Sequence, residues 1–278
     1  MPEMIKDKSY LSALVRERMT VLTIGLDTDI RKIPSIVQSD VLAFNKAIID
    51  ATRDTCIAYK PNFAFYESMG AKGWDILEKT IAYIGDHHFI IADAKRGDIG
   101  NTSAMYAKAI LEQLGCDAIT VNPYMGRDCV KPFYQEGKWV VILALTSNEG
   151  SDDFQKQKLA NGQRLYEEVM ETAASWGDDT NTMFVLGATH PSEVEACREK
   201  YPDHFFLIPG VGAQGGDLDA ICVAGLNQDG GLLINASRSI LYASAGSDFA
   251  EKAREEAIKI NDVIKPHLGG ASFIPYIP

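Results

Sequence analysis

Three features of the sequence predict a closed (β/α)₈ barrel. Short apolar runs suited to buried strands alternate with amphipathic segments along the chain. The length of 278 residues is typical of one such barrel. Polar residues of unusual type follow the apolar runs, and in this fold the chemistry lies at the carboxyl ends of the strands. An open doubly wound sheet is the alternative architecture.

The predicted strands are short runs with few charged residues. Residues 139–145 (Trp-Val-Val-Ile-Leu-Ala-Leu) are typical, because they are apolar throughout, as a buried strand requires. Eight strands are predicted, at residues 21–26, 57–60, 88–93, 117–122, 139–145, 182–187, 205–209 and 231–235.

Amphipathic segments predict seven helices between these strands and one after the last strand. Several have suitable first residues: Asp40 can cap one helix, Asn101 or Thr102 another, and Pro191 suits a first helical position. No linker or low-complexity tract interrupts the pattern, so one domain over residues 1–278 is expected. The predicted helices are residues 41–56, 71–84, 101–114, 127–135, 162–176, 191–200, about 217–224, and 248–265.

The composition is that of a globular protein in a reducing compartment. Hydrophobic residues make up 46% of the chain and charged residues 23%. The net charge of −11 argues against nonspecific nucleic-acid binding. The five cysteines are scattered without a CxxC pair, which indicates reduced thiols. The N-terminus has no apolar signal core and no run has membrane-spanning length, so a cytoplasmic protein is expected.

The segment Asp93-Ala-Lys-Arg-Gly-Asp98 carries the most chemical information. It follows the apolar run 89–92, and the two-residue period of a strand places Asp93 and Lys95 on one face. An ammonium group between two carboxylates is costly to bury unless all three are paired, so such groups are seldom there for stability alone. This arrangement can hold a charged lysine against a substrate and allow it to transfer a proton. An exposed ion-pair cluster is the alternative.

A glycine-rich loop, Pro209-Gly-Val-Gly-Ala-Gln-Gly-Gly-Asp217, follows the seventh predicted strand. Its glycines allow close backbone approach, and its N–H groups can form an anion-binding nest. Arg238 follows the eighth predicted strand, and its planar guanidinium can bind phosphate oxygens. The loops after the seventh and eighth strands form the usual phosphate site of such barrels. Gln214, beside Gly215, can bridge phosphate and base. A plain turn and a surface salt bridge are the alternatives.

Four more polar residues follow predicted strands. Lys60 must be paired if it is buried, with Asp93 or Asp27, and otherwise reaches solvent. Asp27 can bind sugar hydroxyls or cap a helix. Ser147 and Asn148 can hydrogen-bond the edge of a planar base or merely form a turn.

No metal site is predicted. The histidines show no HExxH or Cys/His ligand spacing and are expected to be exposed loop residues. The glycine-rich loop follows the seventh strand rather than the first, so a nicotinamide cofactor is not indicated. Spacing supports no Ser-His-Asp or Cys-His set either.

Taken together, these residues resemble the orotidine 5′-monophosphate decarboxylase family in its longer bacterial branch. The DxKxxD triplet, the lysine of the second strand, the glycine-rich loop and Ser-Arg-Ser-Ile at 237–240 match in order. Leu-Asp at 26–27, Thr-Ser-Asn at 146–148 and Thr-His-Pro at 189–191 also match. One departure is Glu149, where that branch is expected to carry proline.

The resemblance implies a homodimeric barrel that converts orotidine 5′-monophosphate to uridine 5′-monophosphate and CO₂ without metal or organic cofactor. It implies that Lys95 stabilises and protonates the C6 carbanion. It further implies a charge network of Lys60, Asp93, Lys95 and Asp98, with Asp98 and Thr102 supplied by the neighbouring subunit. For the substrate it implies a ribose contact by Asp27 and pyrimidine contacts by Ser147 and Asn148. The implied phosphate contacts are Gln214, Gly215 and Arg238.

Two other functions remain open on sequence grounds. Metal-dependent sugar-phosphate decarboxylases such as 3-keto-L-gulonate 6-phosphate decarboxylase share the DxKxxD pattern but carry an acidic residue near the end of strand two. Here that place holds Lys60, whose charge repels a cation. A catalytically silent phosphate-binding barrel is the second alternative, against which the four charged residues argue.

Overall fold

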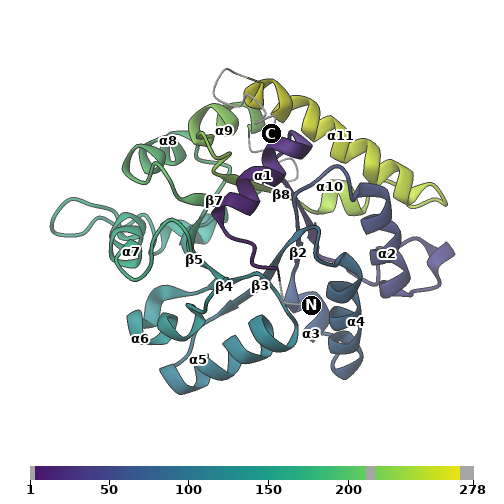
Figure 1. Ribbon diagram of the computed structural model, residues 1–278, viewed down its shortest axis with the longest axis horizontal. Coiled ribbons are helices and arrows are strands. Elements are labelled where there is room, and N and C mark those ends of the chain that lie inside the picture. Colours follow the sequence, from purple (N-terminus) through teal and green to yellow (C-terminus); the bar gives the residue numbers. More distant parts are fainter. Residues whose placement is uncertain (1–3, 211–216, 270–278) are drawn as a thin grey trace.

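The computed structural model describes residues 4–210 and 217–269, which form a closed barrel of eight parallel strands (Figure 1). Each strand pairs with the next along the chain, and β1 pairs with β8 to close the barrel. The predicted barrel is confirmed, and the open doubly wound sheet is wrong. The strands are β1 (Leu22–Leu26), β2 (Ala58–Pro61), β3 (Phe89–Arg96), β4 (Ala118–Val121), β5 (Trp139–Leu145), β6 (Thr182–Leu186), β7 (Phe205–Pro209) and β8 (Leu232–Ala236).

Helices surround this barrel (Figure 1). The α-helices are α1 (Lys8–Arg18), α2 (Val41–Thr52), α3 (Phe63–Glu67), α4 (Ala71–Ile84), α5 (Gly100–Ala107), α6 (Arg127–Val130), α7 (Leu165–Ala174), α8 (Pro191–Lys200), α9 (Leu218–Gly225), α10 (Arg238–Leu241) and α11 (Phe249–Leu268). Short 3₁₀ turns lie at η1 (Ser35–Val37), η3 (Pro123–Met125), η4 (Lys131–Phe133) and η5 (Glu149–Asp152), and η2 (Lys108–Gln113) is a π-helical end of α5.

The predicted helix starts are confirmed at two of three places. The Asp40 carboxylate accepts the Ala43 N–H at 3.0 Å, and Pro191 is the first residue of α8. The predicted cap at Asn101 or Thr102 is wrong, because α5 begins at Gly100 and its preceding residue, Ile99, makes no side-chain cap bond. The predicted helix 127–135 is interrupted after Val130, because the proline that follows Lys131 has no N–H to continue it.

The N-terminal segment closes the amino-terminal end of the barrel. Lys6 is buried there, where its ammonium donates to the Asp117 carboxylate and to the His88 carbonyl, both at 2.8 Å. Its carbonyl accepts the indole N–H of Trp139 at 2.8 Å. Helix α1 follows and lies across the barrel (Figure 1). Neither α1 nor the short α3 after β2 was among the predicted helices.

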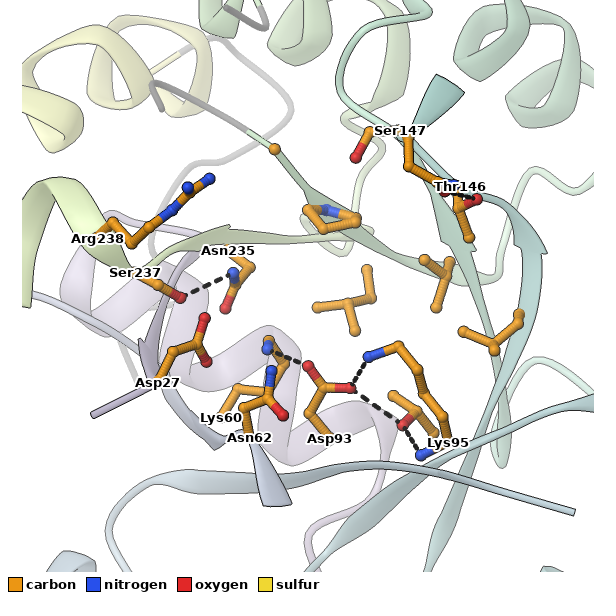
Figure 2. A pocket seen from close by; sticks show the side chains of 17 residues that line it. Asp27, Lys60, Asn62, Asp93, Lys95, Thr146, Ser147, Asn235, Ser237 and Arg238 are labelled. Carbon is orange, nitrogen blue, oxygen red and sulfur yellow. Dashed lines mark hydrogen bonds and ion pairs between the residues drawn. The ribbon is translucent and has the colours of Figure 1, made fainter. Parts of the chain in front are cut away.

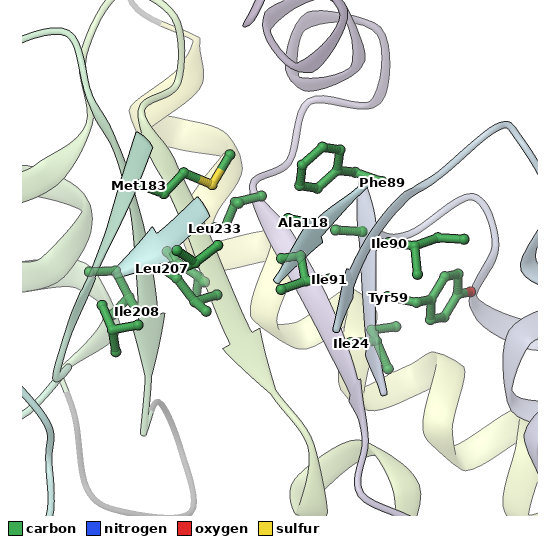
Figure 3. Packing of buried hydrophobic residues seen from close by; sticks show 14 of the residues in the cluster. Ile24, Tyr59, Phe89, Ile90, Ile91, Ala118, Met183, Leu207, Ile208 and Leu233 are labelled. Atoms are coloured by element: carbon green, nitrogen blue, oxygen red, sulfur yellow. The ribbon is translucent and has the colours of Figure 1, made fainter. Parts of the chain in front are cut away.

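The strands are apolar because both of their faces are covered. Figure 3 shows part of this packing, with Ile91 from β3 and Leu233 from β8. The five cysteines are buried free thiols. The expectation of exposed histidines is wrong for His88, which is fully buried and contacts the Arg53 carbonyl through Nε2 at 2.7 Å. No helix in the described ranges is long and apolar enough to span a membrane.

Candidate active site

A cavity of about 310 Å³ lies where the strands end, as the barrel prediction requires (Figure 2). Seven of the eleven predicted site residues line it: Asp27, Lys60, Asp93, Lys95, Ser147, Asn148 and Arg238. They come from β1, β2, β3, β5 and β8 or from the turns that follow those strands. The parallel barrel therefore brings together side chains that lie far apart in the sequence.

Asp93 joins two lysines at the bottom of this cavity (Figure 2). One carboxylate oxygen accepts the Lys60 ammonium at 2.6 Å, and the other accepts the Lys95 ammonium at 2.5 Å. The side chains of Lys60 and Asp93 are only 4% and 9% exposed, whereas that of Lys95 is 52% exposed. The buried Lys60–Asp93 pair thus holds the Lys95 ammonium in the wall of the cavity.

The two buried partners keep each other charged. Burial by itself raises the pKa of Asp93, but the nearby charges of Lys60 and Lys95 outweigh it and hold that pKa well below its usual range. Burial likewise lowers the pKa of Lys60, and the charges of Asp93 and Asp27 outweigh it, so that this pKa lies above its ordinary value. Both groups are therefore ionised at neutral pH.

Two side-chain oxygens in the cavity wall are ready to accept hydrogen bonds. Oδ1 of Asp27 and Oδ1 of Asn235 are buried and make no hydrogen bond with the described residues. Buried acceptors of this kind normally find a donor. Ser237 lies close to Gly25 of β1, where an added Cβ would lie 1.8 Å from the Ser237 hydroxyl oxygen in its present position.

The loop after β5 closes a further part of the wall. Gln155 holds Thr146, accepting its backbone N–H at 2.7 Å, and Asn148 precedes the 3₁₀ turn η5. Glu149 is the first residue of that turn. This position suits proline, because the first residue of a helical turn needs no N–H partner, and the additional N–H of glutamate needs no partner within the turn either.

Four predicted residues are not placed in this cavity. Asp98 and Thr102 do not line it, although Asp98 lies only three residues beyond Lys95. Gln214 and Gly215 fall outside the described residues. Sequence reasoning also missed Asn62, Thr120, Asn235 and Ser237, which do line the cavity. The signal for Asn235 was an amide within an otherwise apolar strand.

Among the described residues, no cluster of three or more His, Cys, Asp or Glu side chains is arranged to hold a metal ion. Arg238, the first residue of α10, also lines the cavity (Figure 2). The cavity thus combines fixed ammonium groups, unpaired acceptors and a guanidinium, which suits an anionic ligand with hydroxyl groups.

Comparison with known proteins identifies a family that acts on such a ligand. Residues 20–254 match the model of the orotidine 5′-phosphate decarboxylase / HUMPS family. The orotidine 5′-phosphate decarboxylase of Phocaeicola vulgatus is 52% identical over 261 residues, covering 91% of this chain and 96% of that protein. That of Parabacteroides distasonis is 50% identical, covering 97% and 99%. The structure of Leishmania donovani OMP decarboxylase is 36% identical, covers 91% and 98%, and superposes with a TM-score of 0.78.

Proposed function

The chain belongs to the orotidine 5′-phosphate decarboxylase / HUMPS family and decarboxylates orotidine 5′-monophosphate to uridine 5′-monophosphate in pyrimidine biosynthesis, and we propose that Lys95 is its proton donor. The observation that supports this role most directly is the position of Lys95. Its ammonium is held at 2.5 Å by a buried, ionised Asp93 and faces the cavity.

The reaction needs a cation at one carbon atom. When the bond between C6 and the carboxylate breaks, CO₂ leaves and the electron pair remains on C6, in the ring plane, where no π system delocalises it. A fixed ammonium group at that place stabilises the developing charge, and its proton then moves to C6 to give the product. Preorganised charges of this kind usually supply the largest catalytic contribution.

Asp93 has two roles in this proposal. It fixes the Lys95 ammonium, and it lies near the place of the substrate carboxylate. Repulsion between the two carboxylates eases as CO₂ leaves, which favours the transition state over the bound substrate. Lys60 holds the other oxygen of Asp93 at 2.6 Å and keeps this carboxylate in position.

The rest of the cavity binds the nucleotide. Asp27, with its unpaired Oδ1, accepts from ribose hydroxyls, and Ser147 and Asn148 contact the pyrimidine edge. Arg238, with Gln214 and Gly215 of the glycine-rich loop, binds the phosphate. Phosphate lies far from the bond that breaks, yet its binding energy can promote closure over the site and exclusion of water.

We further propose a cytoplasmic homodimer, in which Asp98 and Thr102 complete the site of the neighbouring subunit. Both residues stand apart from the cavity of their own barrel. Apolar side chains are exposed around them, with Ile99 56% and Met105 62% exposed, and the adjoining turn after β4 exposes Tyr124 to 89%. Exposed apolar surface next to an incomplete site is typical of an interface.

Decarboxylation is expected to proceed without a metal ion, because Lys60 stands where metal-dependent relatives carry an acidic ligand. The measurement is the loss of orotidine 5′-monophosphate absorbance in the ultraviolet, with and without EDTA. Equal rates are expected. Activity that disappears on chelation and returns with Mg²⁺ contradicts this metal-independent mechanism.

Replacing Arg238 by alanine is expected to weaken capture of the phosphate group. Removing one partner of a buried, hydrogen-bonded charge pair typically costs about 2–5 kcal/mol, and we expect a loss near the lower end of this range because Arg238 is exposed before the ligand binds. The measurement compares kcat/KM for orotidine 5′-monophosphate and for orotidine, which lacks the phosphate. An equal loss on both substrates contradicts the assignment.

A further inference from the structure

The ladder between β3 and β4 is irregular directly beside Lys95. Ala92 pairs with Ile119 and Arg96 pairs with Val121, so residues 93–95 all lie opposite the single residue Thr120. Bulges of this kind occur next to active sites, where they redirect a side chain. Here the bulge contains both Asp93 and Lys95.

Lys95 has an unusual backbone conformation within this bulge. Its φ is +48°, in the left-handed region that residues with a Cβ rarely adopt. Such a conformation persists only where the surrounding structure imposes it. The bulge also leaves the backbone N–H groups of residues 94 and 95 without ladder partners, so some other acceptor must hold them.

That acceptor is the side chain of Thr120. Its hydroxyl oxygen accepts the N–H of Ala94 at 3.0 Å and the N–H of Lys95 at 2.8 Å. Its O–H has two acceptors within reach, Oδ1 of Asp93 at 3.3 Å and the carbonyl of Ala92 at 3.4 Å. The residue is 1% exposed, and one donor and two acceptor sites are all that a hydroxyl has.

We propose that Thr120 is a positioning residue for the reaction, which sets the place of the Lys95 ammonium by holding the left-handed bulge. This inference rests on the role proposed for Lys95. Without the hydroxyl, the part-buried N–H groups of Ala94 and Lys95 lose their acceptor and the bulge relaxes toward ordinary strand geometry. The ammonium then moves away from C6, although the lysine itself is still present.

Thr120→Val removes the hydroxyl and keeps the branched shape. We expect kcat to fall roughly 100-fold, the loss that a misplacement of about 1 Å produces. KM and the affinity for uridine 5′-monophosphate, measured by calorimetry, should change by less than about threefold, because the ligand contacts remain. Thr120→Ser, which restores the hydroxyl, should recover most of kcat.

Thr23→Val is the matched control. Thr23 is a fully buried threonine of β1 whose hydroxyl makes no hydrogen bond with the described residues, so its replacement should leave kcat unchanged. Three results overturn the proposal: a Thr120→Val enzyme with kcat within about threefold of wild type, a Thr120→Ser enzyme as slow as Thr120→Val, or an equal loss in Thr23→Val. If Thr120→Val does not fold, Thr120→Cys replaces it, because a thiol accepts hydrogen bonds weakly.

A crystal structure of the Thr120 variant separates this inference from the proposed function. The φ of Lys95 is expected to leave the left-handed region, whatever reaction the protein catalyses. A φ that stays near +48° shows that Thr120 does not hold the bulge. A wild-type protein that does not decarboxylate orotidine 5′-monophosphate refutes the function while leaving this structural result standing.

Discussion

Replacing Lys95 by alanine is expected to lower kcat by at least about 100- to 1000-fold, the range observed when one preorganised group is removed from the site of developing charge. The fold should survive, because the Lys95 side chain is half exposed and its removal opens no cavity in the apolar core. Nucleotide binding should fall far less than kcat, because the ammonium acts on the transition state. Steady-state kinetics and calorimetry with uridine 5′-monophosphate measure the two effects separately.

Lys79→Ala provides the matched control, since Lys79 is an exposed lysine that also pairs with an aspartate, Asp75, but on the outer helix α4. It should match the wild type in kcat and melting temperature. A folded Lys95→Ala enzyme that keeps more than about a tenth of kcat has lost less than ~1.4 kcal/mol of transition-state stabilisation. That result rules out Lys95 as the proton donor.

Mixing two inactive variants is expected to restore activity if Asp98 acts across a dimer interface. Lys95→Ala and Asp98→Ala are prepared separately, combined in equal amounts and allowed to exchange subunits. A hybrid has one site with both residues intact and one site with both defects. Random pairing makes about half of the dimers hybrid under twofold symmetry, so roughly one quarter of wild-type activity should return.

Each variant carried alone through the same exchange is the control and should stay inactive. If Asp98 serves its own barrel, every site in the mixture keeps one defect and mixing restores nothing. The structure motivates the experiment, because Asp98 does not line the cavity that holds Lys95 and its carboxylate accepts the neighbouring Ile99 N–H at 2.7 Å. Native mass spectrometry of the mixture establishes whether the subunits have re-paired, because the mass of the hybrid lies between those of the two homodimers.

The barrel was predictable because its strands are buried on both faces. Runs such as 139–145 are apolar throughout, and eight of them in one chain leave few other architectures. The helices were less predictable at their ends. Asp40 caps α2 as expected, yet α5 begins without a side-chain cap and continues as a π-helical turn. Tertiary packing sets these boundaries, and local propensity only biases them.

The sequence likewise predicts some features of the candidate site and leaves others undetermined. Asp93, Lys95 and Lys60 were recognisable from sequence, because charged residues at the ends of apolar strands are unusual. The sequence leaves open whether Asp93 or Asp27 pairs with Lys60, and in the structure the Asp93 carboxylate accepts the Lys60 ammonium at 2.6 Å. A residue's partner on another strand depends on register, which the sequence of one strand does not contain.

The barrel and the charged residues at its carboxyl end can be read from the amino-acid sequence, because burial pattern and residue chemistry are local properties. The role of Thr120 in β4 as acceptor for two N–H groups of β3, and the left-handed conformation of Lys95, become visible in the folded chain alone. A lone threonine in an apolar strand carries no signal of this role. The contact exists because the ladder between β3 and β4 breaks opposite this threonine, and the register of two strands is not contained in the sequence of either.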